Sequence, residues 1–193
     1  MTLKKLAVFC SGNGSNFEAV LKAARRGRLQ AQVALMVCDN PKAFAVQRAV
    51  RHEVPLLVLS PRLFECRKSY EELIIRVLKS QSVDYVILAG FMRILTPYFI
   101  REFRGRILNI HPSLLPAFKG AHAIRDAFQA GVSETGASVH GVTEKLDSGP
   151  VIAQVKVKIS KKDTLESLEK KIHRVEHALY PAAIQKYIRK GRK

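Results

Sequence analysis

Asn109–Pro116 is the segment best suited to chemistry, because an amide and an imidazole stand two positions apart at the end of an apolar run. In a β-strand, residues i and i+2 face the same side, so Asn109 and His111 can address one reacting atom together. The two prolines of the segment end the strand and stiffen the loop after it. A carboxylate, Asp147, follows later in the chain. The amide can stabilise a developing oxyanion, the imidazole can transfer a proton, and the carboxylate can tune the imidazole. This combination indicates acyl transfer.

These side chains also have purely structural interpretations. A histidine at the position of His111 could be a core residue whose ring is satisfied by the backbone. Asn109, the proline-rich exit and Asp147 together favour the catalytic interpretation of His111. Asp147 stands in the stretch Asp-Ser-Gly-Pro, which is good turn-forming sequence. For Asp147, the residue types alone therefore leave both a turn former and a catalytic carboxylate open.

The loop Ser11–Asn16 contains two glycines and lies between a predicted strand and a predicted helix. Such a loop turns tightly and offers N–H groups and a helix N-terminus to a phosphate. Phe17 stands where a dinucleotide-binding fingerprint has its third glycine, which argues against NAD, and the Gly-Lys-Ser/Thr of a Walker loop is absent. A phosphate-binding loop and an ordinary capped turn remain as the two interpretations.

Apolar runs rich in β-branched residues alternate with helical patterns along the chain. Strands are predicted at Lys5–Cys10, Gln32–Cys38, Leu56–Leu59, Asp84–Leu88, Arg106–Ile110, Ala137–Val142 and Val151–Ile159. Helices are predicted at Ser15–Arg25, Ala43–Arg51, Ser69–Lys79, Pro97–Glu102, Ala123–Ala130 and Thr164–Ile188. The alternation predicts one α/β domain over residues 1–193: a mostly parallel, twisted, Rossmann-like sheet with helices on both faces. A turn between the last two strands predicts an antiparallel pair near the C-terminal end.

Three loops, 11–16, 89–95 and 109–116, each follow the carboxyl end of a predicted strand. In open α/β sheets, ligands bind outside these strand ends, so the three loops are expected to line one site. Taken alone, Ala89–Leu95 would be interpreted first as hydrophobic core with one exposed arginine.

The charge of the chain is unusual, with 33 Lys and Arg against 16 Asp and Glu, formally +17. Such a field attracts phosphates and polycarboxylates. The basic residues are scattered along the chain, except in the tail 186–193. This distribution favours an ordinary solvated surface most, attraction of small anionic substrates next, and specific nucleic-acid binding least. The first apolar run is too short for a signal peptide or a membrane span. Three widely spaced cysteines form no disulfide framework, so we expect a cytoplasmic protein without a membrane partner.

The segment His173–His177 matches a zinc-peptidase pattern, H-x-x-E-H. Histidines at i and i+4 on a helix share one face and could bind zinc. A third protein ligand is needed, however, and no Asp or Glu occurs after Glu176. We therefore predict that the protein uses no metal.

Several ordered blocks of this chain resemble the folate-dependent formyltransferases, most closely those that act on glycinamide ribonucleotide in purine synthesis. The blocks are Ser11–Asn16, Ala89–Leu95, Asn109–Pro116, Ser138–His140, Asp147–Pro150 and Glu176–Pro181. Together they are a far more specific signal than any single short motif.

The resemblance implies that a single domain transfers a formyl group from 10-formyltetrahydrofolate, as co-substrate, to the amine of glycinamide ribonucleotide. It implies catalytic roles for Asn109, His111 and Asp147. It implies that the ribonucleotide contacts Gly14, Ser15, Asn16, His173 and Glu176. Of these, the loop residues Gly14, Ser15 and Asn16 would bind the phosphate, and Glu176 would bind the ribose hydroxyls. It implies that the folate contacts Arg67, Met92, Arg93, Ile94, Leu95, Asn109, Thr143, Glu144, Lys145, Leu146 and Asp147. These partners are small molecules, and a homodimer is left open.

The chain departs from the family pattern at two places. Lys119 stands where many relatives have proline, and His173 where some have an uncharged amide. Two related activities remain as alternatives: formylation of methionyl-tRNA, and hydrolysis of formyltetrahydrofolate. The phosphate loop and the Glu176 block favour the ribonucleotide over methionyl-tRNA. For the hydrolase, 193 residues are expected to leave no room for the additional N-terminal domain of that family. A basic nucleic-acid-binding domain would leave the Asn109, His111 and Asp147 pattern unexplained.

Overall fold

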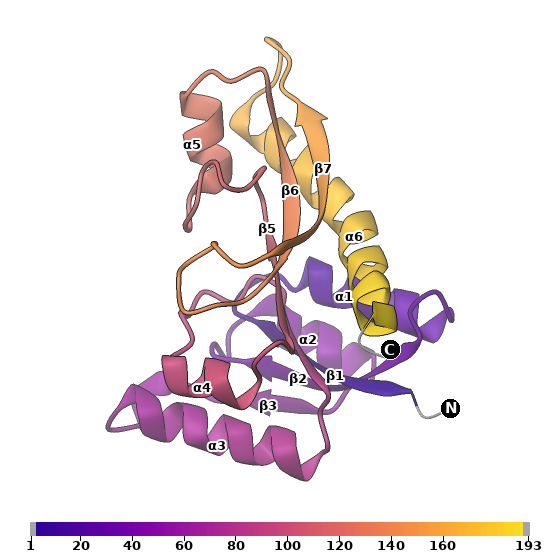
Figure 1. Cartoon of the computed structure of the whole chain (residues 1–193), viewed down its shortest axis with the longest axis vertical. Coiled ribbons are helices and arrows are strands. Elements are labelled where there is room, and N and C mark those ends of the chain that lie inside the picture. The colour runs from indigo at the N-terminus through magenta and orange to yellow at the C-terminus, as the bar shows by residue number, and fades with distance from the viewer. Residues whose placement is uncertain (1–2, 191–193) are drawn as a thin grey trace.

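The computed structural model describes residues 3–190 and shows one seven-stranded sheet flanked by helices (Figure 1). The elements are β1 (Lys4–Cys10), α1 (Ser15–Arg25), β2 (Ala31–Cys38), α2 (Phe44–Arg51), β3 (Leu56–Val58), a 3-10 helix (Pro61–Leu63), α3 (Arg67–Ser80), β4 (Tyr85–Leu88), α4 (Pro97–Glu102), β5 (Ile107–His111), α5 (Ala123–Gln129), β6 (Glu134–Gly141), β7 (Val151–Lys158) and α6 (Leu165–Lys190). The last three residues of the basic tail lie outside the described residues. No described helix has the length and apolarity required to cross a bilayer.

The strand order is β3-β2-β1-β4-β5-β6-β7, and the first five strands are parallel. This confirms the predicted α/β class with its mostly parallel sheet. Strand β6 pairs antiparallel with both β5 and β7, so the predicted antiparallel pair extends to three strands. Strand β6 also begins three residues before the predicted start at Ala137. Glycine is a weak strand former, but position 136 requires it, because a Cβ there would collide with the Val155 carbonyl of the paired strand.

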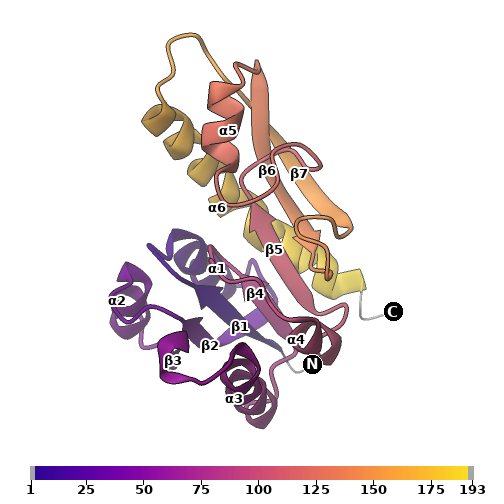
Figure 2. The same cartoon turned by 90° about the vertical axis from the view of Figure 1, so that its left-hand side faces the viewer.

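Helices cover both faces of the sheet (Figure 2). In β1, Leu6 and Val8 pack into one core with α1, α2 and α6, whereas Ala7 and Phe9 pack into a second core with α3 and α4. Because the strand is buried on both faces, its sequence is a continuous apolar run without alternation. The Phe9 ring meets the rings of both Phe91 and Phe99 edge-on, which ties the loop after β4 to this second core.

Helix α6 runs along the sheet from β7 to β1 and carries part of the predicted site (Figure 1). The buried hydroxyl of Tyr180 donates to the carbonyl oxygens of Leu88 and Leu108 at 2.8 and 3.0 Å. Leu88 ends β4 and Leu108 lies in β5, so this contact fixes the helix against the two strands whose ends hold the candidate site.

Candidate active site

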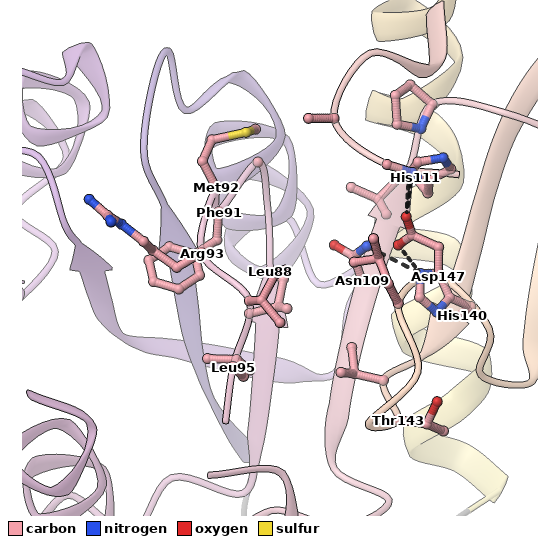
Figure 3. A pocket seen from close by; sticks show the side chains of 18 of the residues that line it. Leu88, Phe91, Met92, Arg93, Leu95, Asn109, His111, His140, Thr143 and Asp147 are labelled. Carbon is pink, nitrogen blue, oxygen red and sulfur yellow. Dashed lines mark hydrogen bonds and ion pairs between the residues drawn. The ribbon is translucent and has the colours of Figure 1, made fainter. Parts of the chain in front are cut away.

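A pocket of about 410 Å³ lies at the carboxyl ends of β4 and β5. Side chains of the 88–95 segment line one side of it, and those of Asn109, His111 and Asp147 line the other (Figure 3). Of the predicted site residues, its lining includes Asn16, Met92, Arg93, Ile94, Leu95, Asn109, His111, Thr143, Glu144, Lys145, Leu146, Asp147, His173 and Glu176.

A second pocket, of about 690 Å³, adjoins the first, because Asn16, Gly90, Met92 and His173 line both. The Ser11–Asn16 loop forms part of its wall, and residues of α6 form another part. Three of the predicted ribonucleotide residues, Gly14, Ser15 and Asn16, enter it from the loop, and His173 enters it from α6. The structure therefore places the candidate phosphate site and the candidate catalytic site side by side.

Asn109 and His111 extend from alternate positions of β5 into the first pocket, as the i and i+2 spacing predicts (Figure 3). His111 is 4% exposed. Its Nδ1 lies 3.6 Å from Oδ2 of Asp147, and its Nε2–H donates to the carbonyl oxygen of Phe118 at 2.8 Å. A carbonyl only accepts, so this bond fixes which ring nitrogen carries a proton in the neutral imidazole. Nδ1 therefore faces the carboxylate.

His140 is part of the same cluster, although the sequence analysis assigned it no role. Its Nδ1–H donates to the Gly141 carbonyl at 2.9 Å, and its Nε2 lies 3.5 Å from Oδ1 of Asp147. The same Nε2 lies 3.1 Å from the amide nitrogen of Asn109. In the antiparallel register of β5 and β6, Asn109 and His140 are direct partners, which explains why the side chains meet. His140, on the neighbouring strand β6, thereby orients the side-chain amide of Asn109.

Asp147 is surrounded by groups that favour its ionised form. The His140 ring 3.5 Å away, the backbone N–H of Gly120 at 2.9 Å and the nearby His111 lower the pKa of Asp147 to about 2, against an opposing effect of burial. Its backbone has φ of 44°, in the left-handed region that non-glycine residues seldom adopt. The structure thus holds a carboxylate in a strained turn directly beside two imidazoles.

Glu176, which is 3% exposed, lines the first pocket and contacts two residues that line both pockets, Asn16 and His173. Its Oε2 accepts a hydrogen bond from the Asn16 amide at 2.9 Å and lies 3.0 Å from Nδ1 of His173. The hydrogen bond to Glu176 raises the pKa of His173. The side-chain oxygen of Asn16 is buried and has no hydrogen-bond partner among the described residues. Polar groups capable of binding hydroxyls or phosphate oxygens therefore converge where the pockets meet.

The zinc-like spacing of His173 and His177 does not gather a metal-ligand set. Within residues 3–190, no group of three or more His, Cys, Asp or Glu side chains is arranged to hold a metal ion. His173 pairs with Glu176 on its own helix instead.

Comparison with known proteins matches residues 4–184 to the model of the formyl transferase family. The chain belongs to the formyl transferase family. It is 43% identical over 186 residues, 96% of this chain and 95% of the other, to phosphoribosylglycinamide formyltransferase of Bacillus subtilis. The solved structure of glycinamide ribonucleotide transformylase 1 from Geobacillus kaustophilus is 50% identical, covers 95% of this chain and 98% of that one, and superposes with a TM-score of 0.93. The human trifunctional purine biosynthetic protein adenosine-3 is 38% identical over 181 residues, and the chain spans 18% of its length.

In this formyltransferase, Arg67 is the one predicted site residue that lines neither pocket. It is exposed at the start of α3.

Arg93 lines the first pocket, but its side chain points away from His111 (Figure 3). Its Nε donates to Oδ2 of the buried Asp39 at 2.7 Å. The 92–95 segment therefore borders the pocket with its backbone and its apolar side chains, while Arg93 anchors it from behind.

Lys119 lies beside the formyltransferase site, although it lines neither pocket. Its Nζ donates to the hydroxyl of Ser148 at 2.7 Å, next to Asp147. Phe118 has φ of 51° and supplies the carbonyl that binds His111. This short segment therefore contacts the histidine, the carboxylate and the following turn.

Replacing Asp147 with asparagine should move the alkaline limb of the turnover profile to lower pH. The carboxylate is ionised at all working pH values because its pKa is near 2, so it favours the protonated imidazole throughout. Without that charge, the protonated form of the site loses a stabilising partner 3.6 Å away, so activity that needs this form should be lost at a lower pH. Asparagine tolerates the left-handed backbone, so the substitution changes charge more than shape. The measurement is kcat as a function of pH.

Asp126→Asn is the matched control, because Asp126 is exposed on α5 and lines neither pocket. It should leave the profile unchanged. An Asp147→Asn profile that is scaled down without any shift of its alkaline limb would contradict the coupling between the carboxylate and the imidazole.

Proposed function

We propose that this chain transfers the formyl group of 10-formyltetrahydrofolate to the amine of glycinamide ribonucleotide, a step of purine synthesis. The observation that carries the proposal is the adjoining pair of pockets, with His111 and Asp147 in one and the Ser11–Asn16 loop in the other. A formyl donor in the first and a phosphate-bearing acceptor in the second would meet at the shared wall. Sequence identity to the Bacillus subtilis enzyme over nearly the full length of both chains supports the same acceptor.

The proposed reaction begins when the amine attacks the formyl carbon and gives a tetrahedral oxyanion. Asn109 donates an N–H to this oxygen; one of its two amide hydrogens is directed at His140, and the other is available. Protonated His111 stabilises the same charge and then gives its proton to the departing nitrogen of tetrahydrofolate. The Asp147 carboxylate, 3.6 Å from Nδ1 of His111, stabilises positive charge on that ring and helps to pass the surplus proton of the amine on to water. Protein groups alone carry these steps, and we propose no metal.

For His111 to reach the substrate, one ring N–H must be released from its present partner. In this structure Nε2 is bonded to Phe118 and Nδ1 faces Asp147. We propose that the substrate takes the place of the Phe118 carbonyl, because the other ring nitrogen faces Asp147, whose negative charge stabilises the protonated ring.

We propose that the folate ring system binds between the 92–95 segment and the 143–147 segment. Met92, Ile94 and Leu146 are exposed large apolar side chains around the first pocket. Such a patch is typical of a ligand site. The predicted contact to Arg67 remains a proposal for the far end of the folate, outside the pocket.

Replacing Glu176 with glutamine should raise the KM for glycinamide ribonucleotide by about tenfold, with little change in the KM for the folate. A carboxylate accepts hydrogen bonds from hydroxyl groups more strongly than an amide does. Glutamine keeps one oxygen that can still accept from Asn16, but it presents an NH₂ group in place of the second carboxylate oxygen, so one acceptor is lost. Steady-state kinetics with each substrate varied in turn is the measurement.

Glu169→Gln is a suitable control, because Glu169 is on the same helix and lines neither pocket. Equal KM values for Glu176→Gln and the unchanged protein would remove Glu176 from the ribonucleotide site.

The test of the function is one assay in which the purified protein receives the formyl donor and three acceptors in turn. We expect formylation of glycinamide ribonucleotide, insensitive to a metal chelator. Formylation of methionyl-tRNA instead, or release of formate with water as acceptor, would overturn the proposal in favour of the two related activities. A gel shift on tRNA at two salt concentrations would reveal phosphate-driven nucleic-acid binding, which weakens steeply with salt.

We further propose that residues 1–193 form a single formyltransferase domain that works in the cytoplasm. The cysteines Cys10, Cys38 and Cys66 are all free thiols, as suits a reducing compartment. Whether the protein forms a homodimer is decided by light scattering at the concentration of the assay.

A further inference from the structure

The Ser11–Asn16 loop rests against α2. The backbone N–H of Ala45, in the first turn of α2, donates to the Gly12 carbonyl at 3.0 Å. Gly14 is close enough to the same residue that an added Cβ would lie 2.7 Å from the Cβ of Ala45. The loop and the helix are therefore closely fitted, and the position of α2 determines the position of the loop.

Arg48, one turn further along α2, holds the next peptide of the loop. Its Nε donates to the backbone carbonyl of Asn13 at 2.9 Å, and a second guanidinium nitrogen donates to the side-chain oxygen of Asn13 at 3.1 Å. The same guanidinium forms an ion pair with Glu18 of α1 and lies 4.8 Å from the centre of the Phe44 ring. The Arg48 side chain is only 19% exposed. Its planar group thus binds the loop, α1 and α2 at once.

These contacts determine where the N–H groups of the loop point. In a planar trans peptide, the C=O and the N–H point in opposite directions. The carbonyls of Gly12 and Asn13 point toward α2, so the N–H groups of Asn13 and Gly14 point away from it. Within residues 3–190, neither N–H donates a hydrogen bond, and both residues line the second pocket. Two free N–H groups ahead of a helix N-terminus form a concavity that binds anions.

We propose that Arg48 is a positioning residue for the phosphate of the acceptor substrate. It lines neither pocket, so it acts through the loop: it fixes the Asn13–Gly14 peptide and thereby directs two N–H groups at the phosphate. The identity of the phosphate-bearing substrate rests on the proposed function. Glu18 supports this arrangement, because it is 16% exposed and also pairs with Lys22 at 2.6 Å.

The test compares Arg48→Lys and Arg48→Met with Arg51→Met. Arg48→Met should raise the KM for glycinamide ribonucleotide about tenfold, as expected for lost hydrogen bonds to a charged group, with kcat and the KM for the folate nearly unchanged. Arg48→Lys keeps the charge beside Glu18, but an ammonium cannot reproduce the two-pronged bond to Asn13, so its KM should rise severalfold. Arg51 is exposed on the same helix, and Arg51→Met should leave all constants unchanged.

A KM for the ribonucleotide that stays at its original value in both Arg48 variants would overturn the proposal. So would a uniform fall of kcat together with a rise of both KM values, because that pattern marks general damage to the fold. If Arg48→Met does not fold, the KM of Arg48→Lys decides alone. If the unchanged protein does not formylate glycinamide ribonucleotide, the proposed function fails, and calorimetry with ribose 5-phosphate tests Arg48 separately. There, about tenfold weaker binding by Arg48→Met supports the proposal, and equal binding overturns it.

Discussion

Turnover of the His111→Ala variant is expected to fall by a factor on the order of 10²–10⁴, because a positioned general acid contributes about that much. The ring is almost fully buried between Asp147 and the Phe118 carbonyl, where water cannot easily replace it as a proton donor. The KM values of both substrates should change much less, since the pockets are lined mainly by other residues. Single-turnover kinetics with saturating formyl donor measures the loss at the chemical step.

His122→Ala is the matched control, because His122 is exposed at the start of α5 and lines neither pocket. It should keep full turnover. Asn109→Ala belongs in the same series, because it removes the proposed oxyanion donor, and loss of such a donor typically costs about 10²–10³ in rate. If His111→Ala and Asn109→Ala both retained nearly full turnover, the assignment of acyl transfer to this pocket would be wrong.

Much of the fold could be predicted because burial on both faces leaves a strong mark on the sequence. β1, β2 and β4 are continuous apolar runs, and their observed bounds agree with the predicted ones to within a residue. The predicted bounds were less accurate where the local sequence has weak strand or helix character and tertiary contacts order the segment. The start of β6 lies in Glu134–Gly136, which has weak strand character and is ordered by pairing with β7. The 3-10 helix Pro61–Leu63 was missed because three residues carry no periodicity.

The candidate catalytic pair on β5, Asn109 and His111, could be predicted from spacing, because alternate residues of any strand face the same side. The predictions for Asp147 and Glu176 came from the family resemblance. Both are now found in the pocket walls, although their chemical roles remain proposals. We expected the phosphate loop to lie next to this site, because ligands of open α/β sheets bind outside the carboxyl ends of the strands.

His140 and the Phe118 carbonyl could not be predicted from the sequence. His140 meets Asn109 only because of the antiparallel register of β5 and β6, which no local pattern specifies. The Phe118 carbonyl reaches His111 through a left-handed backbone conformation that its residue type does not announce. The bidentate contact of Arg48 depends likewise on how α2 packs against the loop. Side-chain partners across elements therefore mark the limit of the sequence analysis, and they include the groups that orient the candidate catalytic residues.

Gly14→Val is expected to raise the KM for glycinamide ribonucleotide by about 10²-fold or more, with the folate KM nearly intact. Gly14 has φ of 76°, which a β-branched residue adopts only with strain, and its Cβ would lie 2.9 Å from the Ala45 Cα. The loop must then move off α2, and the N–H groups of Asn13 and Gly14 turn away from the phosphate. Loss of two hydrogen bonds to a charged group accounts for an effect of this size.

Gly27→Val separates this effect from backbone strain alone. Gly27 has a similar φ of 70°, but an added Cβ would meet nothing within 4 Å, and the residue lies beyond the other end of α1. Both variants should lose stability in thermal melts, because both place valine in the left-handed region. Only Gly14→Val should lose affinity for the ribonucleotide. A ribonucleotide KM that rises equally in the two folded variants would mean that general destabilisation explains the effect, and the loop would no longer be assigned to the phosphate.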